Sequence, residues 1–374
     1  MNESAVNNEG YRGGPYPELH IHRAALEHNL GVFRKLAPKS RILLPVKANA
    51  YGCGIETLFP FFQSAAVDML GVANVVEAMQ LRRLGWQKPV MIFGGFFADG
   101  VRGIVDHGII PSLTDLWQVQ ALDAAAAKPV DIHIKLDLGM GRIGIQKRMV
   151  GELIAALAAA PRLRVAGIFT HFPHTGAEAE RATPAQNDEF KRVAGEIIAA
   201  LRLKREDVLL HAANSYSAAF FPETHHDMIR PGILFYGYYQ CEADRLEFNT
   251  RFNFKPCLEL LATPISVRTL EKGAGISYAS LYHVAAETET VAVLPLGYAD
   301  GIPRALSNDI DFGGHPLRGR VTMDQIILGN AGDASPIRLL GEGLPSLELW
   351  GDRAKSFSYE VMAHLGNRLR RVLV

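Results

Sequence analysis

Lys47 is the first residue whose surroundings point to chemistry. It follows the apolar run Ile42–Val46, which predicts a short buried strand, and it precedes the glycine-bearing segment Ala48–Gly54. A lysine at a strand end usually only extends its amine to water. A lysine at the mouth of a barrel of strands differs, because partial loss of hydration lowers its pKa and makes it a nucleophile or Schiff-base former. Lys47 alone does not decide between these interpretations.

Further polar residues also stand where predicted strands end. In order along the chain they are Tyr51, Lys135, Asp137, Arg142, His171, Asn214, Ser215, Arg230 and Gly232. Each alone has an ordinary interpretation as a solvated side chain. Barrel enzymes build their sites at the carboxyl ends of their strands, so parallel strands would bring all of these residues to one rim. The joint pattern predicts a functional site there.

An alternation of apolar strands and amphipathic helices has to position these residues. Strands are expected at 19–21, 42–46, 69–73, 90–93, 108–111, 132–137, 165–169, 208–211 and 233–236, and helices at 24–36, 58–62, 75–84, 121–127, 151–160 and 188–201. About eight strands, most followed by a helix, within roughly 225 residues match the size of a parallel (β/α)8 barrel. An open doubly wound sheet is the competing architecture, but no G-x-G-x-x-G follows the first strand.

The pattern changes after about residue 239. Short alternating segments such as 258–260, 265–267, 290–294 and 320–321 are separated by Gly, Asp and Asn, which favours strands. The predicted fold class is therefore α/β, a (β/α)8 TIM-like barrel followed by a mostly β C-terminal domain. The expected boundaries are 1–16 for a flexible tail, 17–243 for the barrel that binds the cofactor, and 244–374 for the β domain.

Composition limits the classes of function. The 374 residues are 48% hydrophobic and 21% charged, with 39 basic and 39 acidic side chains. Zero formal net charge offers no electrostatic case for nucleic acid or a membrane surface, so a small-molecule substrate is expected. Three scattered cysteines do not form a disulfide framework or a zinc site, and no metal is expected. With no run of eighteen apolar residues and no cleavage-site pattern near the N-terminus, a cytoplasmic protein is predicted.

Several of these segments together resemble the alanine racemases, enzymes of pyridoxal-phosphate fold type III. The matching motifs, in the family's order, are Val46–Gly52, Lys135–Arg142, Phe169–Phe172, His211–Ser215, Ile229–Ile233, Gly275–Tyr278, Gly297–Gly301, Thr322–Gln325 and Ser358–Glu360. The resemblance runs along nearly the whole chain from about Glu18. It implies a barrel and a C-terminal β domain, which agrees with the strand pattern.

The resemblance implies that the chain interconverts L- and D-alanine with pyridoxal 5′-phosphate as cofactor. The D-alanine formed would be a precursor of the cell wall. Lys47 would form the internal aldimine, and the amino acid would replace it in an external aldimine. The freed Lys47 would move a proton on one face of the α-carbon and Tyr278 on the other. In the family this tyrosine comes from the partner subunit, so a homodimer with shared active sites is expected.

The resemblance also assigns binding roles. Cofactor contacts would come from Tyr51, His171, Asn214, Ser215, Arg230, Gly232, Ile233 and Tyr359, and substrate contacts from Arg142, Met323, Tyr298 and Asp324. Arg230 would leave the pyridine nitrogen unprotonated, which restrains transamination and decarboxylation. His171 and Arg230 are the candidates to favour the phenolate of Tyr278. Lys135 would carry a CO2-derived carbamate, because a bare lysine would repel Arg142.

The sequence departs from the family's usual pattern in places. Cys53 stands where histidine is common, Thr322 replaces a frequent cysteine, and 279–282 lacks the usual glycine. Three alternatives to an alanine racemase stay open. One is a racemase of serine or another small amino acid. A second is a barrel-type decarboxylase, against which the short β domain with Tyr278 argues. The third is a non-enzymatic pyridoxal-phosphate carrier, against which residues 244–374 argue.

Overall fold

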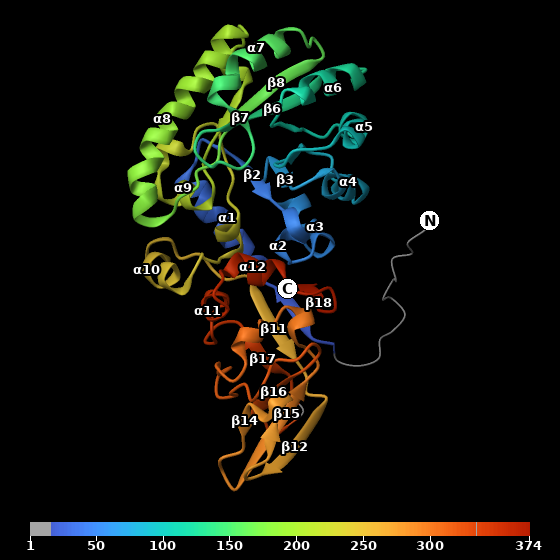
Figure 1. Ribbon diagram of the computed structural model, residues 1–374, viewed down its shortest axis with the longest axis vertical. Helices are drawn as coiled ribbons and strands as arrows, with labels where there is room; N and C mark the ends of the chain where they lie inside the picture. Colours follow the sequence, from blue (N-terminus) through green and yellow to red (C-terminus); the bar gives the residue numbers. More distant parts are fainter. Residues whose placement is uncertain (1–15, 334) are drawn as a thin grey trace. The chain divides into compact units, whose positions relative to one another are not determined.

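The computed structural model describes residues 16–333 and 335–374, which form two compact units. The barrel unit comprises residues 23–239 and 244–257. The β unit comprises the described residues of 1–22, 240–243 and 258–374. Figure 1 shows the elements of both units coloured along the chain.

Parallel strands form the centre of the barrel unit. They are β2 (Arg41–Pro45), β3 (Met69–Val72), β4 (Val90–Ile92), β5 (Ser112–Leu113), β6 (Val130–Asp137), β8 (Leu163–Phe169), β9 (Leu209–His211) and β10 (Met228–Ile229). Pairing runs in the orders β10-β2-β3-β4 and β5-β6-β8-β9. A parallel bridge between Met91 and Ile110 links β4 to the start of β5. The Asp227 amide donates to the Leu210 carbonyl at 3.0 Å and links β10 to β9. The sheet therefore closes, and the predicted barrel is confirmed.

Helices surround these strands (Figure 1). They are α1 (Arg23–Leu36), α3 (Ile55–Ser64), α4 (Val75–Arg83), α5 (Val101–Asp106), α6 (Trp117–Ala125), α7 (Val150–Ala158), α8 (Gly176–Ala200) and α9 (Ser215–Phe220). Helix α10 (Glu242–Phe252) follows the last barrel strand in the chain. Local sequence explains several of their boundaries. Helix α1 buries one stripe that includes Leu26, Leu30 and Phe33, at helical spacing. Helix α4 begins after Asn74, whose side chain accepts the Glu77 amide at 3.0 Å as an N-cap.

Apolar side chains from most of the barrel strands form one layer of the core. The layer contains Leu43, Met69, Met91, Ile110, Phe169 and Met228, with Phe93 and Leu209 packed against it. Residues at alternate positions of one strand share a face, so His133, Lys135 and Asp137 of β6 lie together. A Cβ added to Gly167 of β8 would lie 2.5 Å from Cε1 of His133. Glycine at 167 therefore gives the buried His133 ring its space.

Two segments differ from the sequence-based expectation. Ile233–Tyr236, predicted as a strand, is the 3-10 turn η6, and the eighth barrel strand is the two-residue β10. A short buried apolar run has the same composition in a strand as in a buried helical turn, which explains the error. The first strand, β1 (Glu18–Ile21), belongs to the β unit, although the predicted barrel began at residue 17. Its two edges pair with strands β11 (Leu258–Ala262) and β18 (Arg370–Leu373).

Two main sheets make up the β unit. The first has the order β17 (Ile337–Leu340), β11 (Leu258–Ala262), β1, β18 (Arg370–Leu373), and the second has the order β12 (Ser266–Glu271), β15 (Thr288–Leu294), β16 (Ile326–Gly329). A hairpin of β13 (Gly275–Ile276) and β14 (Tyr282–His283) and the helices α11 (Leu347–Arg353) and α12 (Ser358–Ala363) complete it. The prediction of a strand at 320–321 was wrong, because that segment is a loop before β16. The mostly β character predicted for this region is confirmed.

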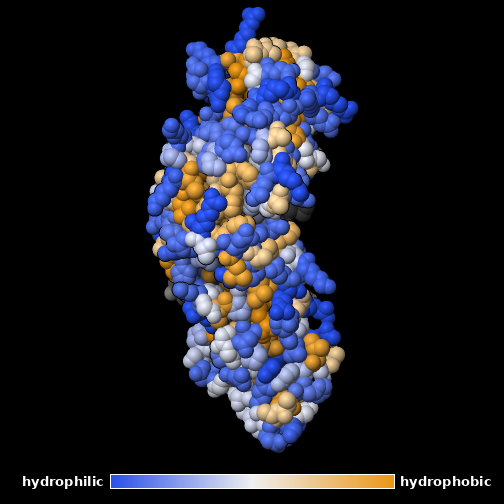
Figure 2. All heavy atoms as spheres, turned by 90° about the vertical axis from the view of Figure 1, so that its left-hand side faces the viewer, coloured by the Kyte–Doolittle hydropathy of each residue, from blue (hydrophilic) through white to orange (hydrophobic). Residues whose placement is uncertain are grey.

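On the face drawn in Figure 2, hydrophobic residues form separate patches among hydrophilic ones. Within residues 16–333 and 335–374, none of the helices has the length and apolar character that crossing a bilayer requires. The same residues contain no cluster of three or more His, Cys, Asp or Glu arranged to hold a metal ion.

Replacing Gly167 by alanine tests the tight packing inside the barrel. Because the new methyl group would meet the hydrogen-bonded His133 ring, G167A should lower the free energy of unfolding by about 1–3 kcal/mol. Urea denaturation followed by circular dichroism measures this. G151A is the matched control, since nothing lies within 4 Å of a Cβ at Gly151 in α7, and it should change stability by less than about 1 kcal/mol. Equal stability of both variants would contradict the packing interpretation.

Candidate active site

Lys47 begins a left-handed turn at the end of β2. In α2 (Lys47–Tyr51), the four residues from Ala48 to Tyr51 have φ of 54–55°. Such a conformation costs about 1–2 kcal/mol for each residue with a Cβ, so the surroundings must hold it. Burial lowers the pKa of Lys47, and the Arg142 guanidinium lowers it further, while the Glu77 carboxylate opposes this shift. A lowered pKa suits an amine that must act as a nucleophile and a base.

The left-handed turn carries Tyr51 to a small polar cradle. A Cβ at Gly232 would lie 2.7 Å from the Tyr51 hydroxyl oxygen and 3.6 Å from Oγ of Ser215. The Gly232 amide donates to the Ser215 Oγ at 2.7 Å. The Asn214 side chain caps α9, because its Oδ1 accepts the Ser217 amide at 3.0 Å. Glycine at 232 therefore keeps a space beside two hydroxyl groups, and Asn214 fixes the backbone that presents Ser215.

Arg230, directly after β10, is a buried cation. Its guanidinium donates to the carbonyls of Thr170 at 2.7 Å and Ala212 at 2.9 Å, and to Nδ1 of His211 at 2.9 Å. No carboxylate of the described residues pairs with it, and burial lowers its pKa to about 9. The guanidinium also lies 3.4 Å from Nδ1 of His171. Neutral dipoles, and not a counter-charge, therefore hold this cation in place.

The histidines around Arg230 are neutral. Burial and the Arg230 charge hold the pKa of His171 well below its usual range, with smaller contributions from other cations. Because arginine only donates, Nδ1 of His211 accepts, and its Nε2 then donates to Nδ1 of His133 at 2.8 Å. Burial lowers the pKa of His133 to about 4. Of the two groups expected to favour a phenolate at Tyr278, only Arg230 carries charge.

Lys135 and Arg142 add two more cationic side chains at the same rim. Lys135 is buried on β6, and burial followed by the Arg142 and Arg230 charges lowers its pKa to about 8. The carboxylate of Asp137 accepts the backbone amides of Gly141 at 2.9 Å and Arg142 at 3.1 Å. Asp137 is thus committed to shaping the loop that carries Arg142.

Tyr278 lies in the β unit on a strained loop, at η7 (Tyr278–Ser280). Ser277, Ala279 and Ser280 have positive φ of 62°, 59° and 46°. The Ser277 Oγ donates to the Arg320 carbonyl at 3.0 Å, and the Arg320 Nε donates back to the Tyr278 carbonyl at 3.2 Å. The Tyr278 side chain is 72% exposed. The loop is thus tied to its own unit while the phenol projects from it.

Tyr298 and Met323 lie on two loops of the β unit that are joined to each other. The Tyr298 amide donates to the Thr322 carbonyl at 2.9 Å. Arg368 binds the buried carboxylate of Asp300 through two bonds of 2.8 and 2.7 Å and that of Asp324 at 2.6 Å. Tyr298 is 44% exposed and Met323 is 53% exposed. Tyr359, in α12, packs edge-on against Phe357 with the ring centroids 5.6 Å apart.

The residues named from the sequence thus fall into two groups. The group in the barrel unit lies at or after strand ends and contains Lys47, Tyr51, Lys135 near the end of β6, Arg142, His171, Asn214, Ser215, Arg230, Gly232 and Ile233. The group in the β unit contains Tyr278, Tyr298, Met323, Asp324 and Tyr359. The sequence did not single out His133, Glu77 or Arg368. His133 had a usable signal, because it lies two positions before Lys135 and shares its face. Glu77 also had a usable signal, because it lies three residues after the N-cap Asn74.

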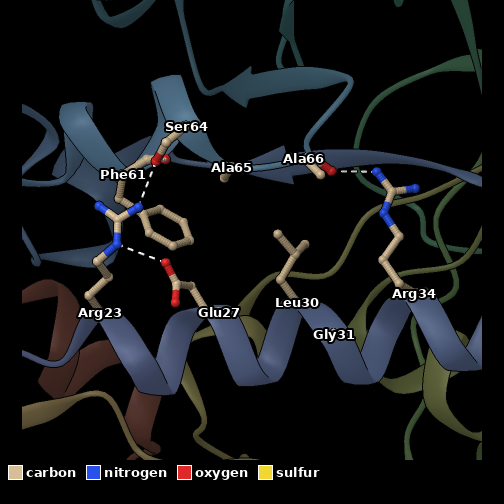
Figure 3. A pocket seen from close by; sticks show the side chains of 9 residues that line it. All are labelled: Arg23, Glu27, Leu30, Gly31, Arg34, Phe61, Ser64, Ala65 and Ala66. Carbon is tan, nitrogen blue, oxygen red and sulfur yellow. Dashed lines mark hydrogen bonds and ion pairs between the residues drawn. The ribbon is translucent and has the colours of Figure 1, made fainter.

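A separate groove of about 290 Å³ lies between α1 and α3 (Figure 3). The Arg23 side chain bridges Glu27 and Ser64 at 2.7 Å each, while Arg34 reaches the Ala66 carbonyl at the other end. None of the site residues named above lines this groove, and its arginines are already paired.

The fold and the site define a (β/α)8 barrel enzyme with a cationic rim suited to an anionic ligand. Family models for the alanine racemase N-terminal domain and C-terminal domain match residues 21–240 and 257–373. An alanine racemase of Treponema pallidum is 31% identical over 379 residues, covering 95% of this chain and 98% of the relative. One of Erwinia tasmaniensis is 32% identical over 369 residues, covering 93% and 96%. The chain belongs to the alanine racemase family.

Solved structures give the same result. The crystal structure of alanine racemase from D-cycloserine producing Streptomyces lavendulae matches with a TM-score of 0.88 at 29% identity, covering 96% of this chain and 97% of that one. The alanine racemase from Streptomyces coelicolor matches with a TM-score of 0.85, also at 29% identity. The similarity in each case extends over both units of the chain.

Alanine racemases depend on pyridoxal 5′-phosphate, and the residues of this chain fit that cofactor. The cradle beside Gly232, which a Cβ would fill, offers the hydroxyls of Tyr51 and Ser215 to a phosphate. Lys47 supplies a primary amine of lowered pKa for the aldehyde. Arg230, buried without a carboxylate partner in the described residues, suits a ring nitrogen that accepts a hydrogen bond.

Proposed function

We propose that the chain interconverts L- and D-alanine in a reaction that uses Lys47 and Tyr278 as its two acid/base groups. Bound pyridoxal phosphate supplies an electron sink that makes the α-hydrogen of the amino acid acidic. The observation that carries the proposal is the buried Arg230 cation, whose partners among the described residues are all neutral. A guanidinium beside the ring nitrogen would disfavour protonation of that nitrogen and so limit electron withdrawal, which favours simple return of the proton over decarboxylation or transamination.

Binding roles are proposed for the remaining rim residues. Tyr51, Ser215, Tyr359 and the backbone amides of Gly232 and Ile233 would hold the phosphate, with Asn214 and His171 supporting the cofactor site. Arg142 and the backbone of Met323 would bind the substrate carboxylate, while Tyr298 and Asp324 would line the access passage. The pairing of Asp137 with the Arg142 loop supports this role, because it fixes where the guanidinium is presented.

Tyr278 is proposed to act from the partner subunit of a homodimer. Its 72% exposure, together with the exposure of Tyr298 and Met323, supports a face of the β unit that a second copy covers. An unassisted phenol has a pKa near 10 and is a weak base at neutral pH. The charge of Arg230 would have to favour the phenolate, because the pKa of His171 is too low for that side chain to be cationic.

Lys135 is proposed to carry a carbamate. A neutral amine is the form that reacts with CO2, and burial with nearby cations lowers the pKa of Lys135 to about 8. The modified side chain would be an anion beside Arg142, replacing repulsion with attraction. The same cations that depress the pKa of the amine would therefore stabilise the product.

The cytoplasm is proposed as the location, supported by the pairing state of the cysteines. All three cysteines lie in the described residues and none is in a disulfide. Such thiols are typical of a reducing compartment.

A racemisation assay with L-alanine and L-serine, with and without added pyridoxal phosphate, tests the proposed function. Cofactor-dependent conversion is expected, with the higher kcat/KM for alanine. Both substrates have to be compared, because a small pocket separates a methyl from a hydroxymethyl group only weakly. A higher kcat/KM for serine would support the alternative of a serine racemase. Absence of racemisation with cofactor bound would refute both.

Replacing Lys47 by alanine should abolish the visible absorption of the covalently held cofactor. Racemisation should fall by about 10²–10⁴-fold or more in both directions, because general acid–base catalysis contributes that much. Circular dichroism measures the racemisation rates, once starting from L-alanine and once from D-alanine. K39A, at an exposed lysine, is the matched control and should retain both properties. Racemisation by K47A at the wild-type rate would refute the assignment.

Replacing Tyr278 by phenylalanine should leave cofactor absorption intact and block proton removal from the L isomer. The expected loss is about 10²–10⁴-fold. Exchange of the α-hydrogen in heavy water, followed by NMR for each isomer separately, measures it. Exchange from D-alanine is the internal control, since Lys47 would serve that face. The two-base scheme fails if both isomers keep exchanging equally.

The carbamate on Lys135 should form reversibly with CO2. With 13C-labelled bicarbonate, a carbamate signal should appear by NMR at pH 8 and above. The signal should decline as pH falls below about 8, because protonation removes the neutral amine. K135A is the control and should lack the signal. An unmodified ammonium in the electron density of crystals grown with bicarbonate would end the hypothesis.

A further inference from the structure

Glu77 connects three elements of the barrel unit through its carboxylate. One oxygen, Oε1, accepts the backbone amide of Ala48 at 2.8 Å, and the other, Oε2, accepts that of Ala73 at 2.8 Å. Ala48 follows Lys47 directly, Ala73 follows β3, and Glu77 itself lies in the first turn of α4. The two bonds therefore tie the segment after β2 to the end of the next strand.

This is not the usual use of a glutamate at the third position of a helix. In a capping box such a side chain bonds back to the amide of the N-cap residue, which here is Asn74. Glu77 instead reaches past Asn74 to Ala73 and across to Ala48. Helix α4 is capped without it, because the Asn74 side chain already accepts the Glu77 amide at 3.0 Å. The Glu77 carboxylate therefore does not cap α4, and it bonds to the segment that follows Lys47.

The segment that receives the bond is strained. Ala48 is the first of four residues in left-handed conformation, none of them glycine, and such backbone persists only where its surroundings fix it. Local bonds hold the far end, where the Gly52 amide donates to the Ala48 carbonyl at 2.9 Å and the Ile55 amide to Oδ1 of Asn49 at 2.8 Å. On the other side of Lys47, the Val46 amide donates to the Gly71 carbonyl at 2.8 Å. Glu77 completes this set at the residue next to the lysine.

The charge of Glu77 also acts on Lys47. The charged or titratable groups that face the amine are Arg142 from the loop after β6, Lys135 from β6, His171 after β8, and Glu77 from α4. Among these, Glu77 raises the pKa of Lys47, whereas burial and Arg142 lower it. The carboxylate thus moderates a cationic environment at the position where the backbone is also fixed.

We infer that Glu77 is a positioning residue for Lys47, setting both the direction of its side chain and the charge around its amine through the left-handed turn. The inference rests on the proposed function for Lys47. It predicts an effect on steps that need the lysine amine, and little effect on substrate binding, since Arg142 is held separately by Asp137.

The experiment replaces Glu77 by glutamine in the full-length protein. Glutamine keeps the size and one accepting oxygen but loses the charge, so one of the two amides must face an NH2 group. The rate at which visible absorption appears after pyridoxal phosphate is added to apoprotein should fall about 10- to 100-fold. The kcat for alanine should fall by a similar factor in both directions while KM changes little. The matched control is E56Q, at an exposed glutamate in the first turn of α3, which should behave as wild type.

If the absorption change and the turnover of E77Q both kept their wild-type rates, the inference would be overturned. The same holds if the thermal midpoint of the apoprotein fell while these two rates stayed unchanged, because Glu77 would then only stabilise the fold. If E77Q does not fold, E77D serves instead, because aspartate keeps the carboxylate but is too short to hold both amides. Wild-type rates in E77D would equally overturn the inference. The absorption readout needs no racemisation. If the wild-type protein bound pyridoxal phosphate through Lys47 but did not racemise alanine, the proposed function would fail while Glu77 remained testable.

Discussion

The buried guanidinium of Arg230, which no carboxylate of the described residues pairs with, is the constraint on which the rest of the site depends. Removing a cation from water costs several kcal/mol unless dipoles replace the lost hydration. Here the carbonyls of Thr170 and Ala212 and the ring of His211 do so for Arg230. The arrangement works only if the surrounding histidines stay neutral, and the direction of the pKa shifts of His171 and His211 agrees with this. The site therefore combines a fixed charge with polar groups that do not compete for protons.

The carboxylates near the rim are already engaged with backbone amides. Asp137 holds the loop that carries Arg142, and Glu77 holds Ala48 and Ala73. Acidic side chains here organise the backbone, and the positive charges of Arg142 and Arg230 remain available to a ligand. A phosphate and a substrate carboxylate together would supply the missing negative charge. The site therefore attracts anions because its acidic side chains bond to backbone amides and leave the charges of its basic side chains uncompensated. The number of basic side chains alone does not explain this attraction.

Sequence patterns predicted the barrel because most strands are apolar runs followed by helices with a buried stripe. They failed where the pattern was too short or depended on distant partners. Strand β10 has two residues and no run of its own, and β1 is defined by edges that meet β11 and β18 far along the chain. Several rim residues could be grouped from the sequence because they lie at or after the end of a predicted strand, as Lys47 and His171 do, whereas Arg230 and Gly232 follow β10, which the sequence did not indicate. The left-handed turn after Lys47 was not predictable, because Ala48–Tyr51 contains no glycine to indicate it.

The residues that depart from the family's usual pattern can each be placed in the structure. The Thr322 hydroxyl donates to the Gln325 carbonyl at 2.8 Å and so closes the turn beside Met323, a task that packing of a thiol would not perform. Cys53 is fully buried and belongs to the core behind the lysine turn. Ala279 and Ser280 occupy positive φ without glycine, where the accessible conformations are fewer. Each of these two residues is strained where glycine would not be, which makes the loop less stable. Its surroundings, including the bonds that join Ser277 and Tyr278 to Arg320, must therefore hold the conformation that presents the tyrosine.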